Sequence, residues 1–133
     1  MTHKWEASAF KSPMARAKGL GAAGSGVHHW IHQKVTALAN IPLVLWAIWS
    51  SLTLAGAGAS YDVIRTFFAQ PINGILMTLF LLSVFYHAAL GLQVVVEDYV
   101  HCEKLKMATL IAIKLGLFAL CVASVFSVLK LAL

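Results

Sequence analysis

Three long apolar segments limit what this chain can fold into more than any other feature of its sequence. They run from about residue 35 to 55, from 71 to 96 and from 107 to 129. Each is close to, or longer than, the ~20 residues that an α-helix needs to cross ~30 Å of hydrocarbon. Hydrophobic residues make up 60% of the chain and charged residues only 11%, whereas a soluble domain has roughly 25% charged residues. The sequence therefore predicts an all-α membrane protein with three transmembrane helices.

The basic residues predict the domain organisation and the topology. No polar segment is long enough for a separate soluble domain, so we expect a flexible basic arm at residues 1–24 and a membrane anchor domain at residues 25–133. The arm supplies most of the net charge of +5, and the loop after the second segment carries Lys104 and Lys106. By the positive-inside rule, the arm and this loop lie in the cytoplasm and the C-terminus lies in the periplasm. We therefore interpret the positive charge first as an indication of membrane topology, and only second as an indication of nucleic-acid binding.

Two prolines and one lysine predict local features of the helices. Pro42 should bend the first helix, and Pro71 can open the second, where its missing N–H would have no partner in any case. Between them, residues 61–70 are typical of a short amphipathic helix on the far membrane face. Lys114 is either a buried functional charge or, as we favour, a side chain whose ammonium reaches the membrane interface.

His87 is the most informative residue of the second segment. An ionisable residue inside an apolar helix is rare and usually functional. It lies 11 residues before Asp98, which corresponds to a rise of ~16 Å and a return to nearly the same helix face. If Asp98 is at the membrane surface, His87 is near the midplane. Gly91 lies on the same stripe and removes a side chain one turn from the imidazole, so a flat ligand could approach the helix closely, although glycine also allows simple helix contact. His87 is therefore a candidate axial ligand for haem iron; the alternative is a histidine that is hydrogen-bonded to another helix.

A haem with two histidine ligands would need a second chain. His87 is the only histidine well inside a predicted span, and three helices enclose a large cofactor poorly. We therefore expect a partner membrane subunit that completes a larger helical bundle, with a homodimer as the less favoured case.

Asp98 and Tyr99 end the second segment and form a candidate quinone site. A tyrosine hydroxyl at the interface can donate a hydrogen bond to a quinone carbonyl, and a nearby carboxylate can orient it or relay protons. An ordinary interfacial tyrosine beside an acidic helix end is equally compatible with the spacing.

Other candidate metal ligands are weaker. His28 and His32 are four residues apart and would share one helix face, but no nearby acid or cysteine completes a ligand set, so we favour polar residues at the interface. Cys102 and Cys121 fit no metal spacing, and the absence of a Cys-x-x-Cys-His motif excludes covalent haem attachment.

Two motifs resemble a known family. The sequence His87-Ala-Ala-Leu-Gly91-Leu-Gln-Val-Val-Val-Glu97-Asp98-Tyr99 resembles the second membrane helix of the small anchor subunit of succinate dehydrogenase. Residues 26–37, Gly-Val-His-His-Trp-Ile-His-Gln-Lys-Val-Thr-Ala, resemble the start of that family's first helix. Together with the three-span layout, the resemblance covers roughly residues 24–133.

The resemblance implies a complete functional assignment. The chain would be an anchor subunit of respiratory complex II, paired with a second membrane anchor subunit and holding an iron–sulfur subunit and a flavoprotein subunit. His87 matches the ligand of haem b, Tyr99 matches the tyrosine that binds ubiquinone, and Asp98 matches its acidic neighbour. The chain would not oxidise succinate itself but would contribute to quinone reduction in the tricarboxylic acid cycle and the respiratory chain.

One residue departs from the family pattern. Many relatives have an arginine near the haem propionates where this chain has Lys34. Lysine keeps the charge but loses the two-pronged geometry of guanidinium, so we expect a weaker propionate contact, with His28 as a second candidate. The short arm indicates the bacterial inner membrane rather than the mitochondrial inner membrane.

Two other functions stay open at this point. A haem-free structural anchor of a quinone-linked oxidoreductase would leave His87 packed in the bundle. A small transporter subunit would use His87 and Lys114 as a proton relay, although the membrane segments contain no acid to face them.

Overall fold

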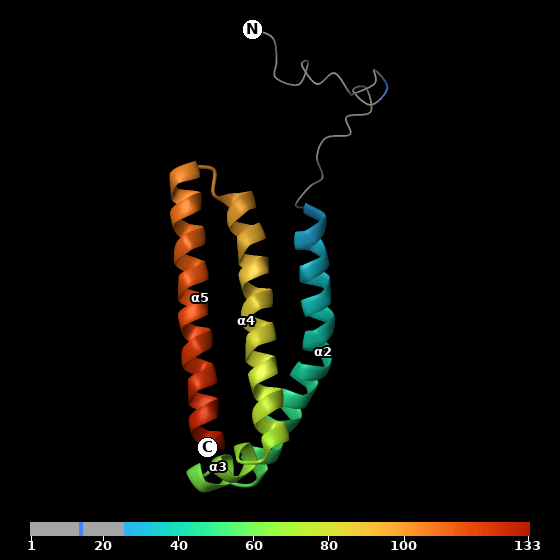
Figure 1. Ribbon diagram of the computed structural model, residues 1–133, viewed down its shortest axis with the longest axis vertical. Coiled ribbons are helices and arrows are strands. Elements are labelled where there is room, and N and C mark those ends of the chain that lie inside the picture. Colours follow the sequence, from blue (N-terminus) through green and yellow to red (C-terminus); the bar gives the residue numbers. More distant parts are fainter. Residues whose placement is uncertain (1–13, 15–25) are drawn as a thin grey trace.

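The computed structural model describes Met14 and residues 26–133, and the arm expected at residues 1–24 lies outside this range except for Met14. Residues 26–133 form helices α2 (Gly26–Gly56), α3 (Tyr61–Phe68), α4 (Pro71–Tyr99) and α5 (Glu103–Ala132), as Figure 1 shows. The described part of the chain contains no strand. The expected all-α fold is confirmed.

Three of these helices are long and apolar enough to cross a membrane: Val27–Gly56, Pro71–Tyr99 and Glu103–Ala132. All three extend beyond the apolar segments of the sequence because polar residues continue the helices at their ends. In each helix, only 6% of the residues in the most apolar stretch are buried. Such exposed apolar surface is expected where lipid or another membrane subunit, and not water, surrounds the helix.

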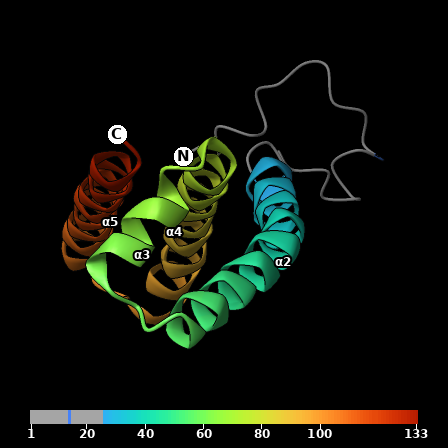
Figure 2. The same ribbon diagram turned by 90° about the horizontal axis from the view of Figure 1, so that it is seen from below.

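α4 is the central helix. It packs against α2 on one side and α5 on the other, while the short α3 contacts α4 and α5. The view from below places α3 across one end of the long helices, and α2 and α5 on either side of α4 (Figure 2). The chain therefore forms an open layer with α4 in the middle, and not a closed bundle.

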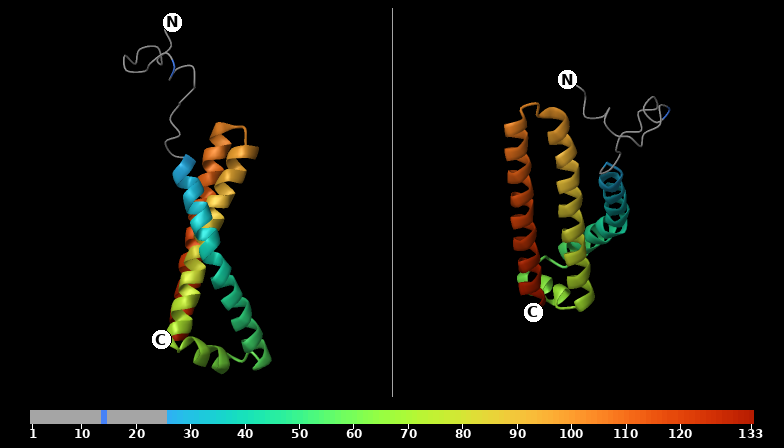
Figure 3. Two further views of the ribbon diagram at one scale, coloured as in Figure 1. Left: turned by 90° about the vertical axis from the view of Figure 1, so that its right-hand side faces the viewer. Right: turned by 45° about the horizontal axis from the view of Figure 1, so that its top comes forward.

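α2 crosses α4 at an angle, and the two helices diverge towards the end that carries α3 (Figure 3). Pro42 lies inside α2, which curves in Figure 2 as expected for a helix that lacks one backbone hydrogen bond.

The connections follow from local sequence. Gly58 with φ 90° and Ala59 with φ 47° turn the chain after α2, a backbone conformation that glycine adopts easily. The Ser60 hydroxyl then caps α3 by accepting a hydrogen bond from the Val63 N–H at 3.4 Å. Pro71 occupies the first turn of α4, as expected. The amphipathic helix expected at residues 61–70 is therefore present as α3.

Candidate functional site

His87 faces α2 from the middle of α4. Its Nδ1 atom lies 2.9 Å from the hydroxyl oxygen of Thr36, and both side chains are partly buried. The Thr36 hydroxyl is also 2.8 Å from the carbonyl oxygen of His32 and 3.2 Å from that of Gln33. Among residues 26–133, Thr36 is the one hydrogen-bond partner of the His87 imidazole. The ring is thus held through Nδ1, and its Nε2 atom has no hydrogen bond to the described chain.

Gly91 lies one turn from His87 towards the end of α4. A Cβ atom at this position would lie 3.5 Å from the Nε2 atom of Gln33, an ordinary van der Waals contact. Within this chain, the small residue therefore permits α2 to pack over α4. Its expected role beside a flat ligand stays a prediction.

A polar stripe on α2 runs along this same interface. His29, Gln33, Thr36 and Asn40 are spaced four, three and four residues apart, which places them on one helix face. The atoms His29 Nε2, Gln33 Oε1 and Asn40 Oδ1 are buried and have no hydrogen-bond partner in the described chain. Buried polar groups nearly always have a partner, so these three atoms mark the part of the interface whose hydrogen bonding the described chain leaves incomplete.

Our sequence reasoning missed Gln33, Thr36 and Asn40 as candidate site residues. The signal was available, because polar residues at helical spacing within an apolar segment mark one face of the helix. The spacing of these residues gave no indication of which helix would pack against that face.

His32 has a different role from the one considered for it. Its Nδ1 atom is 3.1 Å from the hydroxyl oxygen of Tyr86 on α4. In the described part of the chain, no group of three or more histidine, cysteine or acidic side chains can hold a metal ion. The structure thus gives His32 a contact with α4, and the interpretation of His28 and His32 as polar residues at the membrane interface stays a prediction.

Lys34 and His28 lie on the exposed surface of α2. Lys34 is two residues from Thr36, so it projects from nearly the opposite face of the helix, and its Nζ atom is 5.8 Å from the centre of the Trp30 ring. The structure does not bring Lys34 next to His87. Its expected contact with a haem propionate stays a prediction.

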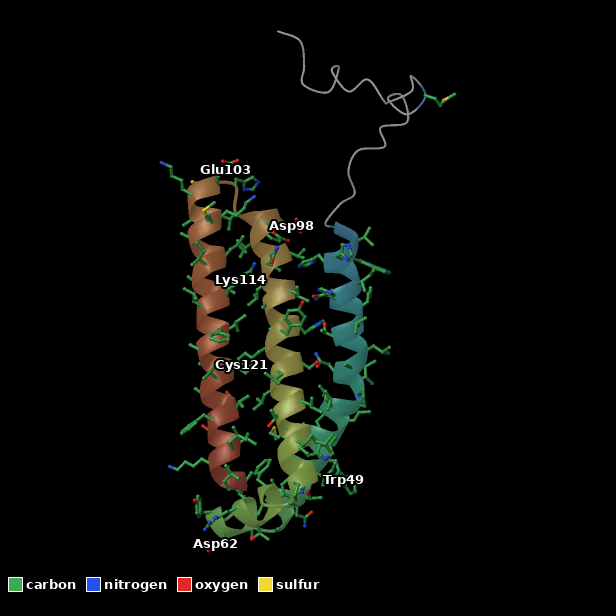
Figure 4. The ribbon with its side chains drawn as sticks, viewed as in Figure 1. Trp49, Asp62, Asp98, Glu103, Lys114 and Cys121 are labelled. Carbon is green, nitrogen blue, oxygen red and sulfur yellow. The ribbon has the colours of Figure 1, made fainter. Side chains whose placement is uncertain are left out.

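Asp98 and Tyr99 lie at the C-terminal end of α4, at the same end of the molecule as the start of α2 (Figures 1 and 4). Both are exposed, and the Tyr99 side chain is 77% accessible. Figure 4 places Asp62 at the opposite end of the helices. The structure therefore presents the two candidate quinone residues at one end of the apolar helices, open to a ligand or a partner.

Lys114 is exposed on α5 and borders an apolar groove of about 540 Å³ between α4 and α5. His87 instead contacts α2, so the two residues proposed for a proton relay belong to different helix interfaces.

Comparison with known proteins identifies the family. The family model for the succinate dehydrogenase/fumarate reductase transmembrane subunit matches residues 8–129. The chain belongs to this family.

Several relatives are membrane anchor subunits of succinate dehydrogenase. The hydrophobic membrane anchor subunit from Rickettsia bellii is 39% identical over 106 residues, which cover 80% of this chain and 83% of the relative. The corresponding subunit from Rickettsia conorii is 33% identical over 107 residues, with the same coverage of each chain. The subunit from Paracoccus denitrificans is 25% identical over 123 residues, or 92% of each chain. No solved structure matches the chain significantly.

The family match includes every part of the candidate site. Residues 8–129 contain the polar stripe of α2, His87, and the Asp98–Tyr99 end of α4. The resemblance inferred from two short motifs is therefore confirmed over nearly the whole chain, and the three apolar helices agree with a transmembrane subunit.

Proposed function

We propose that this chain, as the hydrophobic membrane anchor subunit of succinate dehydrogenase, binds haem b and ubiquinone together with a second anchor subunit. In this role it passes electrons from succinate oxidation to quinone, within the tricarboxylic acid cycle and the respiratory chain. One observation carries the proposal: His87 is a partly buried histidine in the middle of an apolar helix, and one of its ring nitrogens is already engaged by Thr36.

The residues around His87 fit a haem. A neutral imidazole whose Nδ1–H donates a hydrogen bond offers Nε2 to a metal, and no hydrogen bond from residues 26–133 occupies that atom. The same interface contains buried polar atoms without partners. When bound, haem b supplies a one-electron redox site within the membrane. His87 would hold its iron, and Gly91 would leave space beside it.

A second membrane subunit completes the site in this proposal. The open layer around α4 cannot enclose a large cofactor, and the helices have extensive exposed apolar surface for a partner. That partner anchor would supply the other protein ligand of the haem iron. The iron–sulfur and flavoprotein subunits would bind at the end of the helices that carries Asp98. Lys34 and His28, on the outer surface of α2, would face haem propionates held largely by the partner.

Tyr99 and Asp98 would bind and protonate the quinone. The exposed Tyr99 hydroxyl would donate a hydrogen bond to a quinone carbonyl oxygen. The Asp98 carboxylate would orient that hydroxyl and accept protons from water at the membrane surface. Reduction of a quinone to a quinol takes two electrons, supplied by the iron–sulfur subunit, and two protons, which arrive through this end of α4.

The proposed topology follows from charge. The start of α2 and the α4–α5 connection lie at the same end of the molecule (Figure 1), and the connection leads into Lys104 and Lys106. This end would face the cytoplasm, with the C-terminus in the periplasm of a bacterial inner membrane. The mitochondrial inner membrane, with the matrix in place of the cytoplasm, is the alternative.

The test is a reduced-minus-oxidised absorbance spectrum of the purified complex with three forms of this subunit. We expect a b-type band in the native complex, a lost or shifted band with His87→Ala, and a native band with His101→Ala, which removes an exposed histidine between α4 and α5. An unchanged band with His87→Ala would remove His87 as the ligand. If the native complex had no band, the chain would be a haem-free structural anchor.

A further inference from the structure

We propose that Thr36 is a positioning residue that determines which ring nitrogen of His87 carries the proton and how the ring is oriented. This inference rests on the proposed function, because it concerns the face that His87 presents to haem iron. The observation that supports this inference is the contact of 2.9 Å between Thr36 Oγ1 and His87 Nδ1. It is a side-chain hydrogen bond across the α2–α4 interface, where few such bonds occur.

Thr36 has one hydroxyl proton and three acceptors within reach. They are the carbonyl oxygen of His32 at 2.8 Å, that of Gln33 at 3.2 Å, and His87 Nδ1 at 2.9 Å. If the proton goes to a carbonyl, the hydroxyl oxygen accepts a hydrogen bond from Nδ1–H, and Nε2 keeps its lone pair. If the proton goes to Nδ1, a neutral ring must carry its own proton on Nε2 and cannot bind a metal through that atom.

The other hydroxyl groups of the chain indicate which arrangement is adopted. Thr66 and Thr78 donate to the carbonyl four residues earlier at 2.8 Å, and Thr53 donates to the carbonyl three residues earlier at 2.8 Å. Hydroxyl groups in helices commonly bond to a carbonyl of the preceding turn. Thr36 has the same geometry towards His32; in the proposed arrangement its proton is likewise donated to a carbonyl of α2, and its oxygen accepts a hydrogen bond from His87 Nδ1–H.

This hydrogen bond fixes the tautomer of His87 as a metal ligand. With the proton held on Nδ1, His87 presents an unprotonated Nε2 atom to the cofactor side of the ring. A hydrogen bond from Nδ1–H also raises the basicity of the ligating nitrogen and fixes the plane of the ring. A more basic imidazole stabilises ferric over ferrous iron. Thr36 therefore acts on the iron through His87, without touching the cofactor itself.

Three variants of Thr36 and one control test this role in the purified complex. Thr36→Val removes the hydroxyl but keeps the shape, Thr36→Ala also removes it, and Thr36→Ser keeps it. Thr78→Val is the control because Thr78 is also partly buried and bonds only to the carbonyl of Gly74 on its own helix. The two readouts are the haem midpoint potential and the highest g value of the ferric haem, which reports the relative orientation of the axial ring planes.

We expect Thr36→Val and Thr36→Ala to shift the reduction equilibrium about tenfold towards ferrous haem, the lower end of outer-shell effects. For one electron this is about 59 mV. Both variants should also shift or broaden the highest g value, whereas Thr36→Ser and Thr78→Val should be native in both readouts.

The outcomes separate this inference from the function it rests on. If His87→Ala abolishes the haem band but Thr36→Val and Thr36→Ala leave potential and g value unchanged, His87 is the ligand and Thr36 does not position it. If Thr36→Val and Thr36→Ala fail to assemble, Thr36→Ser decides, because a changed potential or g value in an assembled serine variant would overturn the inference. If His87→Ala keeps the native band, the proposed function itself fails.

Discussion

The two interfaces of α4 differ in their chemistry. Towards α2, side-chain hydrogen bonds cross the interface from His87 to Thr36 and from Tyr86 to His32. Towards α5, the described residues form no side-chain hydrogen bond between the helices, and the groove along them is lined almost wholly by apolar side chains. Cys121, which lies between α5 and α4 in Figure 4, is one of the few buried residues of the chain.

This difference indicates a division of roles. In a membrane, apolar contacts between helices gain little over contacts with lipid, so polar groups and close packing at an interface are the specific features. The α4–α5 pair anchors the chain. The α2–α4 pair instead brings His87, its hydrogen-bond partner Thr36 and several unpaired polar atoms together at one helix interface. Changes on the two sides of α4 should therefore have different effects.

The largest effect is expected at the C-terminal end of α4, where Tyr99 lies. Tyr99→Phe removes the hydroxyl of a tyrosine that is 77% accessible, and this hydroxyl would donate a hydrogen bond to the quinone. General acid–base groups typically contribute 10²–10⁴-fold, so we expect succinate-dependent ubiquinone reduction to fall about a hundredfold. Succinate oxidation with a soluble artificial acceptor should be unchanged.

Tyr61→Phe is the matched control for this variant. Tyr61 is also an exposed tyrosine, but it begins α3 at the other end of the helices. Equal quinone reductase activity in Tyr99→Phe and Tyr61→Phe would contradict the proposed quinone site.

The next largest effect is expected from a variant that disturbs the close packing of α2 on α4. Gly91→Leu should displace Gln33, because even a Cβ atom at Gly91 would lie 3.5 Å from its Nε2 atom. Overpacking typically costs about 1–3 kcal/mol, and here we expect reduced haem content and a lower thermal midpoint of the complex.

Two glycine variants serve as controls for Gly91→Leu. Gly91→Ala should be tolerated, since its Cβ makes only an ordinary contact. Gly116→Leu on α5 should have little effect within this chain, where a Cβ at Gly116 would meet nothing within 4 Å. Loss of haem in Gly116→Leu but not in Gly91→Leu would reverse the assignment of the two sides.

A smaller effect is expected from the second hydrogen bond of the polar interface. Tyr86→Phe removes the hydroxyl that lies 3.1 Å from His32 Nδ1. A hydrogen bond of this kind contributes about 1 kcal/mol, so the thermal midpoint should fall slightly while the haem band stays native. A haem band altered as strongly as in Thr36→Val would show that both cross-interface bonds control His87.

Most of the fold could be predicted from the sequence. Segment length and hydrophobicity determine the three membrane helices, and Pro71 defines the start of the second. The order of packing could not be predicted, because apolar helices in a membrane lack the polar-to-apolar asymmetry that tells which face is inside. Only the structure shows that α4 is central and that α2 and α5 lie on opposite sides.

The candidate site was predicted in part. His87 and Asp98 stand out because ionisable residues interrupt an apolar pattern, and their spacing gives their separation along α4. Thr36 belongs to the polar stripe of α2, but a single threonine in a membrane helix is common, so its partner could not be predicted. Its importance depends on a contact between residues 51 positions apart in the sequence, which no local pattern contains.

The smallest effect is expected on the apolar side of α4. Cys121→Ala removes a buried sulfur from α5 and creates a small cavity, so the complex should lose about 1 kcal/mol of stability or less. The haem potential, the ferric g values and quinone reduction should be native, because no polar contact links α5 to His87 in the described chain. Cys102→Ala, at an exposed cysteine, should change neither stability nor spectra. If Cys121→Ala shifted the haem potential as much as Thr36→Val, the two interfaces of α4 would be coupled, and the division between an anchoring side and a cofactor side would have to be abandoned.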